Sequence, residues 1–576
     1  MCAYCPKNQH KFWRNSESTM GKSRLALWLG VSVYLPWVLC GRAGGQVAEP
    51  HERGPIDPWI RAPRPPAAAG ASCQSHVIRD QFRSIQVNVD SRGCNILGDA
   101  ANEPSIAVSP TDPRKIVIGW RQFNSMQSDF REPGWAYSQD GGHSWVFRGS
   151  LDPGVFGSDP VLASGPGGET YYLSINSAEM RLFHSFDSGV SWARWSEVSS
   201  GFIDKPWIVV DQTPGAGRGN IYIAANYFFA RSVDGGESFA EQAHDLGAPS
   251  PTISVAPDGT VYVAEESGSV FVSWDAMHSA DIPSFEYLGN LGYTSFYIRS
   301  DCCPNPDGLH AQSWIVVDHS TGGTRGNLYV AGGRQPKPDV LELDFAVSRS
   351  TDLGQTWSQP VRIHDDAHES GAWQWFGMIS VAANGRIDAV WNDTRNFVDA
   401  PSGRLSELYY AYSVDAGVTW SKNVPVSPVF DTHLGWPGPT PGRNLKIGDY
   451  YHMLSDNLGV NVAYAATFNG EQDIYFLRIG PWDCNANEID DAADIKEARS
   501  RDCNANDVPD ECEYRADVNG DGLTTLSDFT AFRAALTGPT ADTAVPHPCF
   551  ELLDPDHDGD MDLADFYLLE HVFVAP

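Results

Sequence analysis

Short runs of apolar, β-branched and aromatic residues recur along the middle of the chain, and each is followed by a turn and a second run. Runs this apolar are typical of inner strands that are buried on both faces of a sheet. The first runs span 103–108, 159–162, 204–210, 250–255, 312–317, 375–381 and 449–454. Their partners include 116–120, 221–224, 261–264, 328–331 and 387–391. The pattern predicts seven successive units of β-sheet.

Five copies of one short turn lie among these runs. Each copy reads Ser-x-Asp-x-Gly-x-(Ser/Thr)-aromatic, and the copies begin at Ser138, Ser185, Ser232, Ser350 and Ser413. The Asp carboxylate can accept backbone N–H groups within a tight turn, and the Gly can take a positive φ without steric cost. The closing aromatic residue starts the next strand. The equal spacing of the first three copies suits one four-stranded propeller blade per copy.

This turn is identified as the Asp-box, or BNR repeat, and resembles the repeat of sialidases and related β-propeller glycosidases. The resemblance implies a mainly β propeller, which we place over residues 79–480. The seven units predict seven blades, with six blades, as in typical sialidases, as the alternative. The fourth unit has a degenerate turn at Ser273-Trp-Asp275, and the seventh lacks the turn. We expect a strand near 85–89 to complete the seventh blade and close the ring, which removes most sheet edges.

Chain direction decides which residues of such a propeller share a face. The start of a first strand and the end of a second strand lie together, whereas the Asp-box lies on the opposite face. A polar mouth is therefore predicted from the residues at those positions. They are Glu103, Arg121, Asp159, Asp204, Lys205, Glu265, Glu266, Gln312, Arg334, Asp393, Arg395, Asp449, Tyr450, Tyr451 and His452.

The sialidase resemblance implies roles for some of these residues. Sialidases hold a substrate carboxylate with three arginines, because guanidinium groups match carboxylate geometry; here these would be Arg121, Arg334 and Arg395. Their nucleophile is a tyrosine beside a glutamate, with an aspartate as acid/base. The corresponding residues would be Tyr450 or Tyr451, Glu265 or Glu266, and Asp159 or Asp204. The Arg-Ile-Pro sequence of sialidases is absent, and Asn-Glu-Pro stands in its place at 102–104. The alternative to a catalytic site is that the arginines and carboxylates of the mouth pair with one another around a non-catalytic channel.

Two loops near the C-terminus carry oxygen ligands at alternating positions, as calcium requires. Positions one, three, five, nine and twelve carry oxygen side chains, position seven offers its carbonyl, and Gly522 and Gly559 occupy position six. The predicted ligands are Asp517, Asn519, Asp521, Leu523, Thr525, Asp528, Asp554, Asp556, Asp558, Asp560, Asp562 and Asp565. An apolar helical stretch follows each loop, so the sequence predicts a small calcium-binding α module.

Paired loops of this kind, each followed by one helix, resemble a dockerin over 514–576. The resemblance implies bound Ca²⁺ and a cohesin-type scaffold or cell-surface partner. Residues 481–513 hold two weaker loops, 483–494 and 502–513, which resemble calcium-stapled spacer repeats of the thrombospondin type. Both loops lack Gly at position six, where Glu488 and Asp507 stand. A disulfide-tied acidic linker is the alternative interpretation of this segment.

Composition and targeting signals indicate where the chain acts and which partners are excluded. A net charge of −33 on 576 residues argues against nucleic acid and anionic membranes as partners. Lys22 and Arg24 precede a short apolar run, so 1–43 is predicted to be a signal peptide, with Met20 as a possible start, rather than a membrane anchor. Residues 44–78 are predicted to be a disordered linker, and no other segment is expected to span a membrane.

The cysteines that follow the predicted cleavage are even in number, which suggests disulfides in an exported chain. We expect Cys73 to pair with Cys94 and Cys503 with Cys512, whereas the sequence assigns no partner to Cys302 or Cys303. Together these features predict a secreted, calcium-binding propeller directed at carbohydrate, with O-glycoside hydrolysis as its reaction and a glycan as its ligand. The alternative is a non-catalytic propeller that binds glycan or protein at the cell surface.

Overall fold

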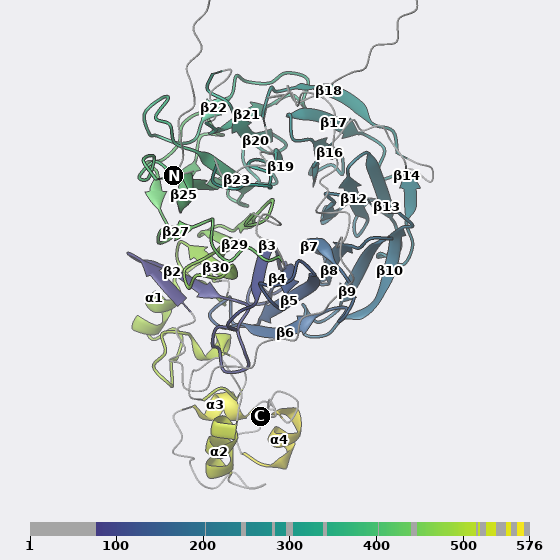
Figure 1. Ribbon diagram of the computed structural model, residues 1–576. Coiled ribbons are helices and arrows are strands. Elements are labelled where there is room, and N and C mark those ends of the chain that lie inside the picture. The colour runs from purple at the N-terminus through teal and green to yellow at the C-terminus, as the bar shows by residue number, and fades with distance from the viewer. Residues whose placement is uncertain are drawn as a thin grey trace, which may run out of the picture. The chain divides into compact units, whose positions relative to one another are not determined.

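The described strands form seven antiparallel sheets that follow one another around a ring (Figure 1). The computed structural model describes residues 76–569 except 202, 243–248, 279–282, 295–302, 338–341, 401–402, 439–445, 486, 514–515, 519–525, 537–548 and 555–560. The predicted signal peptide, 1–43, lies outside the described residues, as does the predicted linker up to residue 75. Within the described residues, no helix is long and apolar enough to cross a membrane.

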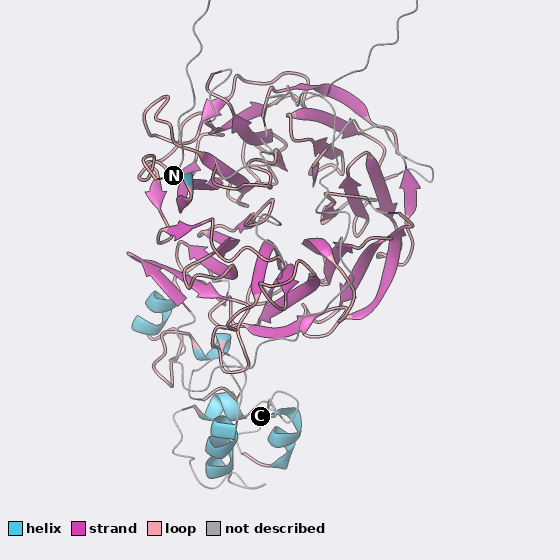
Figure 2. Cartoon of the chain, viewed as in Figure 1, coloured by secondary structure: helices cyan, strands magenta, loops and turns pink. Residues whose placement is uncertain are grey.

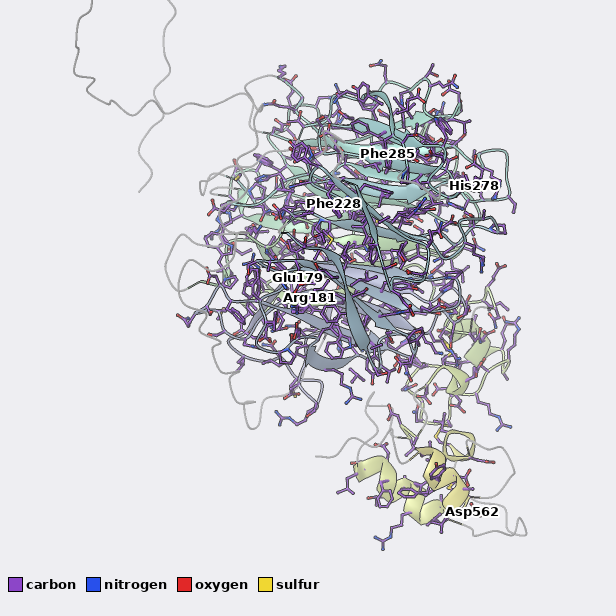
Figure 3. All side chains as sticks on the ribbon, turned by 90° about the vertical axis from the view of Figure 1, so that its right-hand side faces the viewer. Glu179, Arg181, Phe228, His278, Phe285 and Asp562 are labelled. Atoms are coloured by element: carbon purple, nitrogen blue, oxygen red, sulfur yellow. A yellow bond between two sulfur atoms is a disulfide. The ribbon has the colours of Figure 1, made fainter. Side chains whose placement is uncertain are left out.

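The first three blades are four-stranded. Blade 1 consists of β3 (Ala100–Val108), β4 (Ile116–Phe123), β5 (Glu132–Ser138) and β6 (Val146–Ser150). Blade 2 consists of β7 (Ser158–Ser164), β8 (Thr170–Ile175), β9 (Met180–Ser185) and β10 (Ala193–Ser199). Blade 3 consists of β11 (Trp207–Val210), β12 (Ile221–Ala225), β13 (Phe228–Ser232) and β14 (Ala240–Gln242). Figure 3 labels Glu179 and Arg181 at the start of β9, where the Arg181 Nε donates to the Glu179 Oε1 at 2.7 Å.

Blades 4 to 6 repeat this order. Blade 4 consists of β15 (Thr252–Val255), β16 (Val261–Ala264), β17 (Ser269–Ser273) and β18 (Glu286–Asn290). Blade 5 consists of β19 (Trp314–Val317), β20 (Leu328–Arg334), β21 (Asp344–Ser350) and β22 (Val361–Arg362). Blade 6 consists of β23 (Gln374–Val381), β24 (Ile387–Asp393), β25 (Leu405–Ser413) and β26 (Val424–Pro425), and β27 (Phe430–Asp431) also pairs with β25.

The seventh blade joins the two ends of the propeller. It consists of β28 (His452–Ser455), β29 (Val460–Ala466) and β30 (Asp473–Ile479), followed by β2 (Phe82–Gln86) and β1 (His76–Arg79) from the N-terminal side. Ile85 lies opposite Phe476, and the Val87 N–H donates to the Ile474 carbonyl at 2.8 Å. The strand predicted near 85–89 therefore closes the ring, and the structure has seven blades rather than six. β1 begins at His76, within the last residues of the predicted linker.

Neighbouring blades are also joined through their innermost strands. Each innermost strand contacts the next, and β28 contacts β3. At the closing seam the Leu162 N–H donates to Ser105 Oγ at 2.9 Å, and Ser105 Oγ lies 3.0 Å from His452 Nδ1. The Ile106 N–H also donates to His452 Nδ1 at 3.3 Å. Side chains thus satisfy backbone groups on the free edges of β7 and β3, which links blades 2, 1 and 7.

The five Asp-boxes share one geometry on the turns between the third and fourth strands. In the first, Ser138 Oγ donates to Asp140 Oδ1 at 2.6 Å and accepts the Gly142 N–H at 2.8 Å, while the Ser144 N–H donates to Asp140 Oδ1 at 3.0 Å. Gly142 has a φ of +97°, and the corresponding glycines of the other four turns are also positive. The carboxylate and the glycine therefore have the roles predicted from the sequence.

The degenerate turn of blade 4 keeps part of this arrangement. Ser273 Oγ donates to Asp275 Oδ1 at 2.9 Å, and the N–H that Asp275 accepts comes from Ser284 at 3.1 Å. The additional residues between Asp275 and Ser284 therefore lengthen the turn without removing the carboxylate from its centre.

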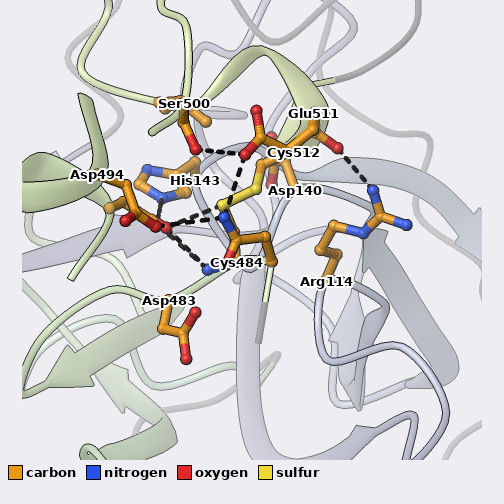
Figure 4. The surroundings of a disulfide bond; sticks show 12 residues. Arg114, Asp140, His143, Asp483, Cys484, Asp494, Ser500, Glu511 and Cys512 are labelled. Atoms are coloured by element: carbon orange, nitrogen blue, oxygen red, sulfur yellow. Dashed lines mark hydrogen bonds and ion pairs between the residues drawn. A yellow bond between two sulfur atoms is a disulfide. The ribbon is translucent and has the colours of Figure 1, made fainter. Parts of the chain in front are cut away.

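The segment that follows β30 packs onto blade 1 (Figure 4). The ring of His143, in the first Asp-box, lies 4.0 Å from the ring of Trp482. Arg114 Nη1 donates to the Glu511 carbonyl at 2.6 Å, and Asn457 Nδ2 of blade 7 donates to Glu488 Oε1 at 3.0 Å. Residues 481–513, which we call the spacer, are therefore held against blades 7 and 1. It contains α1 (Asp491–Lys496) and the 3₁₀ turn η2 (Asp510–Cys512).

The disulfides of the C-terminal region differ from the sequence prediction. Cys503 pairs with Cys549 and Cys484 pairs with Cys512, so the predicted Cys503–Cys512 bond is wrong. Cys484 and Cys512 are both buried, and they pack with Val508 in a small core of the spacer. The packing of this core brings the two distant cysteines together. Cys94 is disulfide-bonded, while its predicted partner Cys73 lies outside the described residues.

Among the described residues after the spacer there are three short helices: α2 (Leu526–Ala535), α3 (Phe550–Leu553) and α4 (Leu563–Leu569). Figure 2 shows these helices in cyan, in contrast to the strands of the ring. The Phe566 ring lies 5.7 Å from Phe529 and 5.8 Å from Phe532, so α4 packs on α2. Ala516, Leu553 and Met561 are buried in the same small core. We call residues 514–569 the C-terminal module.

The buried His452 predicts how acid affects the propeller. Burial lowers the pKa of His452 to about 3, below the unfolded value near 6.5. The stability contributed by the neutral ring is therefore complete above about pH 6.5 and is lost as the pH falls, by up to about 1.4 kcal/mol per pH unit. We expect His452→Asn, whose amide oxygen can accept from Ser105, to be less stable at pH 7 but to lose less stability on acidification. Thermal melts of both proteins from pH 7 to pH 4 check this. The prediction is refuted if the melting temperatures of the wild type and the variant fall in parallel with pH.

The two C-terminal disulfides should have separable effects. Each closes a loop of 28 or 46 residues, so the removal of either is expected to cost about 3–4 kcal/mol locally. Loss of Cys484–Cys512 in a double serine variant should loosen the spacer and lower the melting temperature of the propeller. The Cys503→Ser, Cys549→Ser variant should leave the melting temperature of the propeller unchanged. Thermal melts followed by circular dichroism of the β signal, together with protease cleavage within 481–513, distinguish the two double variants. Equal shifts of the melting temperature in both variants would contradict the packing of the spacer on blade 1.

Candidate functional site

Several of the predicted mouth residues meet in one buried ionic cluster. Arg121 Nη2 lies 3.0 Å from Glu103 Oε1, and Lys446 Nζ lies 2.6 Å from Asp449 Oδ2. Lys205 contacts the same Asp449 oxygen and lies 4.0 Å from Asp159 Oδ2. All of these side chains are almost completely buried. We call Glu103, Arg121, Asp159, Lys205, Lys446 and Asp449 the mouth cluster; it joins blades 1, 2, 3 and 7.

Backbone strain accompanies this cluster. Glu103, Asp159 and Lys205 have φ values of +54°, +49° and +55°, and Ser250 at the equivalent position of blade 4 has +49°. Each of the four precedes a proline. β-bulges follow at 102–105 and 158–161, where the register with the second strand shifts. A positive φ is costly for side chains other than glycine and tends to occur at functional positions. Three of these strained residues, Glu103, Asp159 and Lys205, belong to the mouth cluster.

Two segments cover the mouth cluster. The Asn305 side chain joins them, because its Nδ2 donates to the Gly448 carbonyl at 2.9 Å and its Oδ1 accepts the Ile447 N–H at 3.0 Å. The Leu309 N–H donates to Asp449 Oδ1 at 3.0 Å. A side chain at Gly448 would collide with Glu103, since a Cβ there would lie 2.7 Å from Glu103 Cγ. The described parts of these segments, 303–312 and 446–449, therefore pack directly on the charges.

Aromatic rings lie beneath the cluster. The Trp207 ring lies 4.8 Å from Trp314, 5.4 Å from Tyr450 and 5.2 Å from His452. Trp207, Trp314 and His452 also line a cavity of about 220 Å³ between the innermost strands, whose walls include Val108, Ser164, Ser254 and Ser380. The cavity is small compared with ligand pockets of roughly 300–1,000 Å³.

Burial and charge determine the protonation of these groups. Burial raises the pKa of Glu103 to about 8, against the opposing effect of Arg121. Burial, reinforced by Glu103 and Asp159, raises the pKa of Tyr450 above its usual range. The Tyr450 hydroxyl donates to the Pro160 carbonyl at 2.9 Å. In this arrangement the phenol is a neutral hydrogen-bond donor rather than an ionised nucleophile, and the alternative Tyr451 is likewise buried, with its hydroxyl 2.6 Å from the Ala465 carbonyl.

The two adjacent glutamates, Glu265 and Glu266, differ in their surroundings. The Glu265 carboxylate is occupied in its own hairpin turn, where it accepts N–H groups from Ser267 and Ser269. Glu266 is partly exposed, and burial together with the nearby Glu265 raises the pKa of Glu266 to about 7, against a smaller effect of Lys205. A carboxyl group with a pKa near 7 can donate or accept a proton at neutral pH.

The three predicted clamp arginines lie against different neighbours. Arg121 belongs to the mouth cluster. Arg395 Nη2 lies 2.7 Å from Asp393 Oδ2 and its Nη1 lies 2.6 Å from Asp365 Oδ1, while its guanidinium lies 4.3 Å from the centre of the Tyr409 ring. Arg334 is exposed at the end of β20, opposite Asp344. The geometry does not favour a shared carboxylate clamp, which stays a prediction.

Sequence reasoning did not identify Lys446 or Asn305. Both lie in irregular segments between blades, where no strand or turn pattern gives their position. Lys446 contacts the cluster only because residues 446–449 fold back over Glu103. The i, i+3 spacing of Lys446 and Asp449 was the available signal, but charged pairs at that spacing are common.

The predicted calcium ligands are described only in part. Asp517 and Asp528, at positions one and twelve of the first loop, are both buried, as are Asp554 and Asp565 of the second. The Val518 N–H donates to Asp528 Oδ1 at 3.2 Å, and the Asp562 N–H donates to Asp565 Oδ2 at 2.8 Å. The remaining predicted ligands, Asn519, Asp521, Leu523, Thr525, Asp556, Asp558 and Asp560, lie outside the described residues. Buried acids at both ends of each loop fit a bound cation.

The spacer loops have matching internal geometry. Asn485 and Asn487 donate to Asp494 Oδ2, and Asn504 and Asn506 donate to Glu513 Oε1 at the equivalent positions. Glu488 and Asp507, which replace the glycine at position six, both have a φ of +64°. The backbone of each loop therefore makes the turn that glycine would favour.

Comparisons with known proteins give a limited sequence relationship. No family model matches the chain. A stretch of 147 residues, 24% of the chain, is 27% identical to a sialidase of Clostridium perfringens, and the match spans 38% of that relative's length. The chain thus corresponds to less than two fifths of this curated relative.

Solved structures with some likeness include YCF48 bound to a D1 peptide, at 12% identity and a TM-score of 0.37, covering 70% of this chain and 96% of that one. Trypanosoma rangeli sialidase has 12% identity and a TM-score of 0.32, and the match covers 70% of this chain and 60% of the sialidase chain. An ancestral GH74 enzyme has 12% identity and a TM-score of 0.40, and the match covers 72% of this chain and 51% of that enzyme chain. Likenesses at these scores carry no argument about activity. By its own sheet topology this chain is a seven-bladed β-propeller, and a quarter of its sequence is similar to part of a sialidase.

Proposed function

We propose that this chain is a secreted, carbohydrate-directed propeller that hydrolyses O-glycosides at the mouth described above. The observation that carries the proposal is the place of Glu266, which is partly exposed just after the second strand of blade 4, where burial and Glu265 raise its pKa to about 7. Such a group can protonate the leaving oxygen of a glycoside at neutral pH. The sequence similarity to part of a sialidase supports a glycan as the ligand. Asp159 and Asp204, at the starts of neighbouring first strands, are the candidate partner carboxylates.

A second candidate function is glycan or protein binding without catalysis. It is favoured by the charge pairing in the mouth cluster, because Arg121, Lys205 and Lys446 each already face a carboxylate of the chain. It is also favoured by Tyr450, whose raised pKa disfavours the phenolate that a tyrosine nucleophile needs.

Calcium completes the proposal. The twelve predicted loop ligands, Asp517 to Asp528 and Asp554 to Asp565, would hold two ions in the C-terminal module through carboxylate and carbonyl oxygens. The ions would neutralise the buried acids at the ends of each loop. By resemblance to dockerins, the module would then attach the propeller to a cohesin-type scaffold or a cell surface.

The catalytic hypothesis predicts that Glu266→Gln lowers turnover of a responsive glycoside by about 10²–10⁴-fold while the fold is retained. The matched control is Glu286→Gln, which changes an exposed glutamate on the outer strand of the same blade and should leave turnover unchanged. A panel of chromogenic glycosides, followed by kinetics on any that react, tests this. If no glycoside reacts but calorimetry detects a bound oligosaccharide, the non-catalytic function replaces the catalytic one.

Calcium removal should affect only one part of the molecule. Because clustered carboxylates repel one another without the ion, chelation is expected to unfold the C-terminal module and leave the β signal of the propeller unchanged. Hydrogen exchange with and without chelator measures this, and Asp528→Ala with Asp565→Ala should reproduce the effect of chelator in the presence of Ca²⁺. An unchanged exchange rate after chelation would rule out the calcium assignment.

A further inference from the structure

A shaft enters the centre of the propeller from the face that carries the Asp-boxes. The cavity of about 220 Å³ forms this shaft, and its walls come from the innermost strands of all seven blades. Val209, Ser254 and Val316, toward the ends of these strands, are partly exposed, whereas Trp207 and Trp314 at the strand starts are only 5% exposed. The wall residues and the turns from first to second strands all belong to the described part of the chain. The shaft is therefore open at the Asp-box face and closed toward the mouth.

One hydrogen-bond donor lies at the floor of the shaft. The Ile106 N–H and the Ser105 hydroxyl lie 3.3 and 3.0 Å from His452 Nδ1. A backbone N–H can only donate, so Nδ1 is the acceptor nitrogen and the proton of the neutral ring is on Nε2. His452 lines the shaft, and within the described residues its Nε2 has no hydrogen-bond partner. The Nε2–H is therefore available to an acceptor atom in the shaft.

The shaft is electrically neutral along its described walls. None of the side chains that line it is acidic or basic, although the whole chain has a net charge of −33. Burial also keeps His452 neutral, because it lowers the pKa of the ring to about 3. At the rim, Gln212 Nε2 donates to the Ser164 carbonyl at 2.9 Å. A charged ligand would lose its water here without gaining a partner of opposite charge, so the shaft favours an uncharged ligand.

Aromatic rings give the floor its shape. The Trp314 and His452 rings lie within 20° of parallel at 5.7 Å, and the Trp207 ring is almost perpendicular to Trp314 at 4.8 Å. Rings arranged in this way offer offset and edge-to-face contacts to a further aromatic ring. An apolar cavity of roughly 150 Å³ can hold one benzene molecule. A shaft of about 220 Å³ therefore has room for one substituted ring.

We propose that the shaft binds a small, uncharged aromatic molecule whose carbonyl oxygen accepts the Nε2–H of His452. The ring of the ligand lies against Trp207 and Trp314, and its other substituents point toward the rim at Ser254. The site is separate from the mouth, because the Trp207 ring lies between the shaft and Tyr450, 5.4 Å from the Tyr450 ring. The inference goes beyond the proposed function and does not rest on it.

Three ligands of similar size test the proposal on the full chain with Ca²⁺ present. Acetophenone has a neutral ring with a carbonyl acceptor, ethylbenzene has nearly the same shape without the acceptor, and benzoate carries a charge. In calorimetry we expect acetophenone to bind about tenfold or more tightly than benzoate. We expect it to bind about 2–10-fold more tightly than ethylbenzene, since one hydrogen bond distinguishes the two. Acetophenone should also shift the Nε2 resonance of His452 in NMR spectra of ¹⁵N-histidine-labelled protein.

A blocked shaft locates the site. Ser254→Phe places a ring at the rim and should weaken acetophenone binding by about tenfold or more, because the ring occupies the space of the ligand. The matched control is Ser200→Phe, which makes the same change at an exposed residue after β10 and should leave binding unchanged. Circular dichroism checks that both variants are folded.

Several results would overturn the proposal. They are equal binding of the three ligands, tighter binding of benzoate, no binding of any of them, and unaltered acetophenone binding in a folded Ser254→Phe variant. If that variant does not fold, the ligand comparison and the His452 resonance of the unaltered chain decide the question. Glycoside turnover is measured separately, so failure of the shaft proposal is distinguishable from failure of the proposed function.

Discussion

Closure of the ring is the constraint on which the rest of this structure depends. Seven sheets can share one axis only if the last sheet pairs with the first, and here β2 completes the seventh blade against β30. The pairing joins residues almost 400 positions apart, since Asn88 Nδ2 donates to Asp473 Oδ1 at 2.6 Å. The Ser105–His452 contact then holds the inner edge of the same seam. Without this closure, the starts of the first strands would not converge and the mouth cluster would not form.

Much of this architecture follows from local sequence patterns. The Asp-boxes specify their own turns, because Ser138, Asp140 and Gly142 interact within a few residues of one another. Apolar runs such as 261–264 specify inner strands. Successive side chains of a strand point to opposite faces of the sheet, so a continuous apolar run fits a strand that is buried on both faces. The seven-blade count was predicted from the same runs. A closing strand was predicted near 85–89 from the strand missing in the last blade, and the structure has it at Phe82–Gln86.

Contacts between distant segments were less predictable. The Cys484–Cys512 pairing depends on how two spacer loops pack, whereas sequence spacing favoured the wrong partner for Cys503. The three arginines lie at equivalent ends of strands, but they meet different partners: Glu103 of β3 lies against Arg121, whereas Asp393 and Asp365 lie against Arg395. Lys446 enters the mouth from an irregular segment that carries no periodicity. The choice of Glu266 over Glu265 depends on a hairpin turn that uses the Glu265 carboxylate and leaves Glu266 partly exposed.

The packing of Trp482 on His143 has a mechanical consequence. Tension applied to the C-terminal module would pass through Cys503–Cys549 into the spacer and then through Cys484–Cys512, and would reach the ring at blade 1 and blade 7. Those blades meet at the seam where the N-terminal strand enters. The load would thus be divided between both sides of the joint instead of peeling β30 from its neighbours.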